Sequence, residues 1–191
     1  MRAWAGVAGP LTFIGTWSLL GAIKADYSPV NDPISRLAAV DSPQRAAMTG
    51  AFLIFGIGVS AFAAEVRQAF PGAAPFTLAT TAVATIGVAA TPIGSALGAT
   101  PHAVAAGISY ASLAATPVLT SRHLPNRAAS MASLAVGLAS GSSLLASALA
   151  PRGVGLLQRV GLTLGDAWIV ATALWMASRR DARPPQLHTA A

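Results

Sequence analysis

Charged side chains are scarce in this sequence of 191 residues. They make up 9% of the chain, whereas a soluble domain carries about 25%. Between Gln68 and Ser121 there are 54 residues without a single Asp, Glu, Lys or Arg. One helix of that length would measure roughly 80 Å, against a hydrocarbon core of about 30 Å. The uncharged stretch therefore predicts two membrane-spanning helices joined by an uncharged turn at 98–101.

Cysteine is absent, which excludes disulfides and thiolate chemistry and leaves the redox compartment open. Acidic residues are fewer than basic ones, and the net charge is +6. In a soluble protein that balance would suggest nucleic acid. Here the basic residues are scattered between apolar runs, so anionic lipid headgroups and membrane topology explain them better. We expect the lipid bilayer as partner, and no nucleic acid.

Hydrophobic residues make up 54% of the chain, and the mean hydropathy is +0.61. The predicted fold class is all-α, a polytopic integral membrane bundle of six transmembrane helices. Residues 1–178 form this single domain, and 179–191 form a short disordered cytoplasmic tail. Ser42 and Thr100 each precede a proline and are predicted helix N-caps. The expected spans are 4–23, 45–64, 76–96, 101–120, 128–149 and 154–178.

Basic residues are unequally divided between the two sides of a six-span chain. The side that holds both termini carries seven, and the other side carries five, three of them offset by Asp26, Asp32 and Asp41. Because positive loops stay in the cytoplasm, the count predicts a plasma-membrane protein with both termini cytoplasmic.

Small residues dominate the predicted spans, which favours close helix packing in lipid. Two glycine pairs have the spacing of such contacts, Gly137 with Gly141 and Gly161 with Gly165. We expect them to pack helices within the bundle. A homo-oligomer formed through the small-residue faces is the alternative.

The longest connection, residues 24–44, is predicted to be extracytoplasmic. In it, Asp32 and Pro33 open a short helix as N-cap and first turn, with Ile34, Leu37 and Ala38 on one face. This helix either lies on the membrane surface or folds over the mouth of the bundle. The carboxylates and Tyr27 are ordinary solvated loop residues, or they line a lid together with Arg36.

Polar residues from two further segments are expected on the same side. His102 lies in the first turn of the fourth span and suits acid–base work, or it is an interfacial histidine wetted by water. One histidine among scattered carboxylates does not make a zinc site, so no metal is expected, and no cofactor.

The last span carries the strongest polar signal, Gln158 and Arg159 followed by Asp166. Arg159 and Asp166 share a helix face, about 10 Å apart in rise. Asp166 lies at mid-span, where an unpaired charge costs a few kcal/mol. It therefore faces a polar pocket or a cation such as Arg159, Arg36 or Lys24, either for function or as a structural bond between helices.

Three segments resemble one family: YSPVNDPISRLAA after the first span, the Pro92 to His102 stretch, and GLLQRVGL at the start of the last helix. The sequence is similar, over roughly 5–178, to the uncharacterised six-span bacterial and archaeal membrane proteins of domain-of-unknown-function family 998. The resemblance implies a six-helix bundle and brings no established activity. The positions that match the family are Asp32, Ser35, Leu37, His102, Gln158 and Arg159. Asp166 is not one of the matching positions.

Two functions remain open at this point. One is a polar pocket on the extracytoplasmic side for a lipid or isoprenoid-type substrate, with catalytic Asp166, His102 and Asp32 in terpene cyclase-like or headgroup chemistry. Its binding residues would be Arg159, Gln158, Arg36 and Tyr27. The other is a non-enzymatic bundle that partners another membrane protein, senses the envelope or passes a small solute. The sequence leaves undecided whether the protein is an enzyme.

Overall fold

The chain folds into a bundle of long helices in the computed structural model, which describes residues 2–181. Five of the helices have the length and hydropathy needed to cross a membrane. The remaining long helix, α3, is apolar but has only 17 residues, a length at the lower limit for a membrane span. The elements are α1 (Arg2–Ile23), the 3-10 helix η1 (Ile34–Ala38), α2 (Arg45–Ala69), α3 (Ala74–Ala90), α4 (Ala99–Ser121), α5 (Arg127–Leu149) and α6 (Val154–Asp181).

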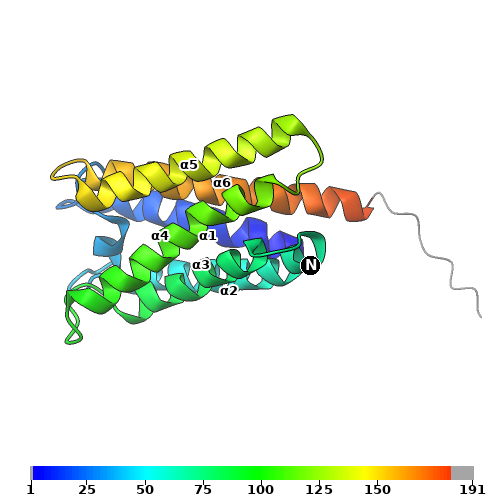
Figure 1. Ribbon diagram of the computed structural model, residues 1–191. Coiled ribbons are helices and arrows are strands. Elements are labelled where there is room, and N and C mark those ends of the chain that lie inside the picture. The colour runs from blue at the N-terminus through cyan, green and yellow to red at the C-terminus, as the bar shows by residue number, and fades with distance from the viewer. Residues whose placement is uncertain (1, 182–191) are drawn as a thin grey trace, which may run out of the picture.

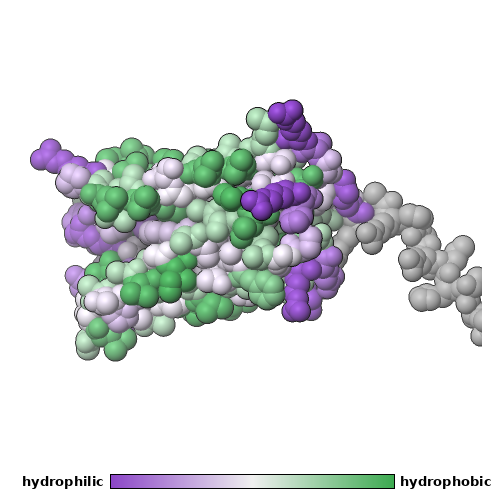
Figure 2. Space-filling model, viewed as in Figure 1, coloured by the Kyte–Doolittle hydropathy of each residue, from purple (hydrophilic) through white to green (hydrophobic). Residues whose placement is uncertain are grey.

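The six long helices pack in chain order, and α6 closes the bundle by returning to α1 (Figure 1). The connections 24–44, 91–98 and 150–153 lie together at one end, called here the loop end. The N-terminus, the α2–α3 and α4–α5 turns and the last turns of α6 lie at the other, the termini end. Hydrophilic side chains gather at both ends, and the surface between them is largely apolar (Figure 2). This is the surface of a helical membrane protein.

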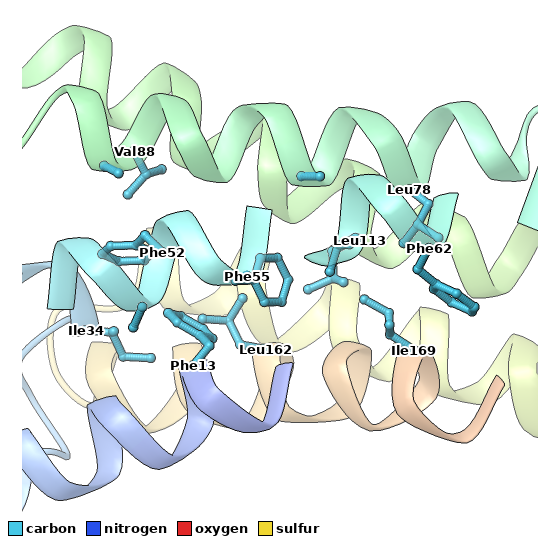
Figure 3. Close-up of a cluster of buried hydrophobic side chains, with 14 of the residues drawn as sticks. Phe13, Ile34, Phe52, Phe55, Phe62, Leu78, Val88, Leu113, Leu162 and Ile169 are labelled. Atoms are coloured by element: carbon cyan, nitrogen blue, oxygen red, sulfur yellow. The ribbon is translucent and has the colours of Figure 1, made fainter. Parts of the chain in front are cut away.

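Aromatic rings fill the loop-end half of the core. The ring of Phe13 on α1 lies 5.3 Å from the rings of both Phe52 and Phe55 on α2 (Figure 3). Farther along the bundle, Phe62, Leu78 and Ile169 continue the same apolar interior.

Both glycine pairs pack helices inside the bundle, as expected. A Cβ at Gly137 would meet the side chain of Val118 at 2.6 Å, so this glycine lets α5 approach α4. Gly161 and Gly165 do the same for α6, where a Cβ would meet Leu144 at 2.5 Å and Leu113 at 2.6 Å respectively. At the first of these contacts Ser140 also donates a 2.7 Å hydrogen bond to the Gly161 carbonyl.

Hydroxyl groups join α3 to the second half of α4. Thr85 pairs with Ser109 at 3.0 Å, Thr81 donates to Ser112 at 2.9 Å, and Thr116 donates to Thr77 at 2.9 Å. Each of these threonine hydroxyls also lies within hydrogen-bond distance of a carbonyl of the preceding turn, so its one hydrogen has an acceptor without water. Since lipid offers no hydrogen-bond partners, this hydroxyl seam takes the place of apolar packing between the two helices.

Some helix ends differ from those expected. The third helix ends at Ala90 instead of 96, so the turn to α4 is longer and spans 91–98. The expected caps Ser42 and Thr100 are wrong. The residues that precede α2 and α4 are Gln44 and Gly98, and Gly98 has a φ of 79° that suits only glycine. The last helix runs to Asp181, three residues beyond its expected end. The rest of the predicted tail, 182–191, lies outside the described residues.

We expect Thr81→Val to lower the free energy of unfolding by about 0.6 kcal/mol, the typical strength of one interhelical hydrogen bond in a membrane protein. A double-mutant cycle with Ser112→Ala in mixed micelles measures the coupling. Thr80→Val, at an exposed position of the same helix, is the matched control and should change little. Zero coupling in the cycle would contradict a role for the seam in stability.

Candidate functional site

The 24–44 connection builds its own rigid turn. The carboxylate of Asp32 accepts from the Ser28 amide at 2.7 Å and from the Arg36 guanidinium at 2.6 Å. Partial burial raises the pKa of Asp32, but the two hydrogen bonds outweigh it and leave the pKa below its usual value. Asp32 is thus a turn residue, not the N-cap. Pro33 occupies the cap position of η1 and provides no side-chain cap.

The short helix η1 folds into the mouth of the bundle and does not lie on the membrane surface. Its apolar face is fully inserted, with Ile34 1% and Leu37 0% exposed. It packs against α1, α2 and α6. The predicted face of Ile34, Leu37 and Ala38 is therefore confirmed, and the segment 27–38 is called the lid from here on.

Arg159 fastens the lid to α6. One guanidinium nitrogen donates to the carbonyls of Pro29 at 2.7 Å and Asp32 at 3.1 Å, and the other donates to the Tyr27 hydroxyl. The side chain is 8% exposed, and the rings of Trp17 and Tyr27 lie 5.2 and 5.5 Å from the guanidinium carbon. Burial raises the pKa of Tyr27, partly offset by Arg159, so its hydroxyl stays neutral near pH 7. The charge of Arg159 is thus held by carbonyl dipoles and aromatic faces.

Gln158 is the second α6 side chain that holds the lid, and with Arg159 it forms the two fastenings of the lid. Its side-chain oxygen accepts from the Ile34 amide at 2.7 Å, and its amide nitrogen donates to the Tyr110 hydroxyl on α4. Two backbone amides at the start of α6 also bind the lid. The Leu156 amide donates to the Val30 carbonyl at 2.9 Å, and the Gly153 amide donates to the Asn31 side chain at 3.1 Å. The first turns of α6 therefore hold the lid from end to end.

A small cavity lies directly beneath the lid. Its volume is about 30 Å³, room for one or two water molecules. Its lining includes the aromatic rings of Phe13, Phe52 and Phe55, which lie near Ile34 in Figure 3. The polar side chains of the lining are Ser35, Thr85, His102, Ser109, Tyr110 and Gln158, and apolar residues of α3, α4 and α6 such as Val88, Ala106 and Leu162 lie with them.

His102 faces this cavity from the first turn of α4. Its Nδ1 lies 2.7 Å from the Thr91 carbonyl, which can only accept. Nδ1 therefore carries the hydrogen, and in the neutral ring Nε2 is the free acceptor. The fourth-span histidine is thus held by the end of α3 and not simply wetted by water.

Asp166 does not line the cavity and lies four residues, about 6 Å of rise, beyond Leu162, which does. It is 0% exposed, and neither carboxyl oxygen has a hydrogen-bond partner among residues 2–181. Of the alternatives left open, the ion pair with Lys24 or Arg36 is not formed within residues 2–181, because Lys24 binds Asp26 and Arg36 binds Asp32. Arg159 is already engaged by the lid.

The structure thus divides the predicted site residues into three places. Tyr27, Asp32, Arg36, Gln158 and Arg159 belong to the lid and its fastening, where Gln158 reaches the cavity as well. His102 lines the cavity, and Asp166 lies deeper. No three His, Asp or Glu side chains within residues 2–181 are grouped closely enough to hold a metal ion.

Sequence reasoning missed two residues of the site. Tyr110 lies at mid-helix, where nothing in the pattern distinguishes it from a lipid-facing aromatic residue. Gly155 lies in the first turn of α6, where a Cβ would overlap the carbonyl oxygen of Asp32 and lie 2.6 Å from that of Pro29. Only glycine lets the lid backbone come this close to α6.

We expect Gly155→Ala to lift the lid from α6 and to destabilise the protein by roughly 1–3 kcal/mol. Because the chain has no cysteine, Ser35→Cys places a single thiol on the buried side of the lid. Its alkylation rate in membranes should rise when Gly155→Ala is added. Gly15→Ala, where a Cβ meets nothing within 4 Å, is the control. Equal alkylation rates with and without Gly155→Ala would contradict a lid held by close contact.

Arg159 and Asp166 should behave as independent sites. We expect the unfolding free energies of Arg159→Ala and Asp166→Ala to add within about 0.5 kcal/mol in the double variant. The bonded pair Arg159→Ala and Tyr27→Phe provides the positive control, and should show coupling. A coupling energy between Arg159 and Asp166 above about 1 kcal/mol would contradict this independence and would indicate an ion pair between the two side chains.

A comparison with protein-family models finds one match, and it covers almost the whole bundle. The matched residues are 7–175, which include the lid, both of its fastenings, His102 and Asp166. No curated protein and no solved structure matches the chain. The chain belongs to the family described as "Protein of unknown function (DUF998)".

Proposed function

We propose that this membrane protein holds the polar end of a lipid or isoprenoid-type molecule in the cavity beneath the lid. The observation that carries the proposal is a cavity inside a membrane bundle whose lining combines aromatic rings with hydrogen-bonding side chains. Such a mixed lining suits an amphiphile, because its chain and its polar end need different surroundings.

The polar side chains that line the cavity offer a ligand one hydrogen-bond acceptor and one donor. Nε2 of His102 is free to accept, as its other nitrogen is bound to Thr91. The Tyr110 hydroxyl accepts from Gln158 and retains its own hydrogen to donate. A hydroxyl or ester group of a ligand would satisfy both. His102 is also placed to take a proton from such a group as a general base.

Entry of a ligand requires the lid to open. The closed cavity holds no more than one or two water molecules, far less than an isoprenoid unit. When the lid lifts, Arg159 loses its carbonyl partners, and an anionic group of the ligand would replace them. Lid opening would thus be coupled to binding, which makes Arg159 a binding residue only in the open form.

Asp32 and Asp166 have different places in this proposal. Asp32 fixes the lid turn and would act as an acid only after leaving Arg36. Asp166 does not line the closed cavity. A buried protonated carboxyl there would serve as a proton donor only to a chain that reaches deeper into the bundle.

The plasma membrane is the proposed location, with both termini in the cytoplasm. The support is the excess of basic residues at the termini end. The cavity would then open toward the outer leaflet.

A non-enzymatic bundle is the second candidate. The observation that favours it is that Gln158 and both terminal nitrogens of Arg159 are bonded to the lid, as structural residues would be. In that case the lid is a permanent plug, and the protein acts through a partner in the membrane.

Mass spectrometry of lipids that co-purify in native-membrane discs tests the proposal. We expect a specific lipid or isoprenoid with the wild type, reduced at least tenfold in His102→Ala. His123→Ala, an exposed histidine at the termini end, is the matched control and should retain it. Asp166→Asn reports whether the deeper carboxyl contributes to binding or changes the chemical form of the ligand. Only bulk lipid in every sample would favour the non-enzymatic bundle.

A further inference from the structure

A groove runs between α5 and α6 on the outer surface, away from the lid. It is open to the membrane, and its volume is about 490 Å³. Small apolar side chains form its floor and sides, among them Ala132, Ala167 and Ala171. Trp168 and Trp175 of α6 provide its aromatic surface. An apolar groove of this kind faces lipid chains and has the shape to hold one.

The groove ends at a basic cluster at the termini end. The segment Leu124–Asn126 lines that end of the groove, with Arg122 on one side and Arg127 on the other. Arg179 stacks on Trp175, with its guanidinium carbon 4.5 Å from the ring. Arg122, Arg127 and Arg179 are exposed, and none forms an ion pair with another described residue.

We propose that this groove is a binding site for an anionic phospholipid of the leaflet at the termini end. One acyl chain would lie between α5 and α6, and the phosphate would lie among Arg122, Arg127 and Arg179. Arginine recognises phosphate oxygens with two parallel donors, and unpaired arginines at the membrane surface attract anionic headgroups. Trp175 lies where the aromatic residues of membrane proteins meet the headgroup level.

A second groove on the same bundle provides an internal comparison. It lies between α3 and α4, is apolar, and has a volume of about 630 Å³. At its termini end Arg67 lies 6.0 Å from the ring of Phe76. Acyl chains would occupy either groove, but only the α5–α6 groove has three cations to select the headgroup.

Native mass spectrometry with added phosphatidylglycerol or phosphatidylcholine tests the site. For the wild type we expect one tight phosphatidylglycerol adduct, with a Kd at least tenfold below that of phosphatidylcholine. Each Arg→Gln change at 122, 127 or 179 should reduce this preference about fivefold, from roughly 1 kcal/mol for each basic residue near the surface. Arg67→Gln is the matched control and should retain the preference. No preference in the wild type, or an equal loss in Arg67→Gln, would overturn the site.

Filling the groove tests the acyl chain separately. Ala132→Leu with Ala171→Leu adds bulk on both walls at exposed positions, so the fold should be preserved. We expect the phosphatidylglycerol adduct to weaken at least tenfold. Ala135→Leu, exposed on α5 but outside the groove, should bind as the wild type does. A dimer that dissociates in the filled variant, with lipid binding unchanged, would overturn the proposal and assign the groove to a second copy of the chain.

Discussion

The guanidinium group of Arg159 lies where the first turns of α6 meet the lid, and much of the loop end depends on it. A buried cation in a membrane protein needs partners, and here the lid backbone, Tyr27 and Trp17 supply them. The contact serves both partners, since Arg159 also supplies donors to the carbonyls of Pro29 and Asp32 in the lid. Gly155 permits the approach, and Gln158 next to Arg159 fixes Ile34 over the cavity. The cavity exists because this backbone segment is held above it.

The rest of the bundle solves the same problem of polar groups in lipid by other means. Between α3 and α4, hydroxyls pair across the interface and also bond to their own helices. Between α5 and α6, glycine and serine bring backbones close enough for Ser140 to reach the Gly161 carbonyl. Asp166 stands out against this pattern, because its carboxyl is completely buried and has no hydrogen-bond partner within the described residues.

Hydropathy predicted the helices well, because apolar length is nearly sufficient to define a span. The resemblance to the family is confirmed, and the short apolar helix in the long loop is present. The helix ends were harder to predict, since the caps at Gln44 and Gly98 use backbone geometry and not the expected side chains. The partners of Arg159 could not have been predicted, because backbone carbonyls carry no sequence signal. The same spacing that placed Arg159 and Asp166 on one face suggested an ion pair, whereas the arginine side chain extends toward the lid.

The central claim is that Arg159 keeps the lid closed over the cavity, and hydrogen exchange of the lid amides tests it most directly. In the wild type the Ile34 amide, bound to Gln158, should exchange slowly in lipid discs. In Arg159→Gln its exchange should accelerate at least tenfold, while amides in the middle of α3 keep their wild-type rates. Unchanged protection of Ile34 in Arg159→Gln would contradict the account, and would show that the apolar face of η1 alone holds the lid in place.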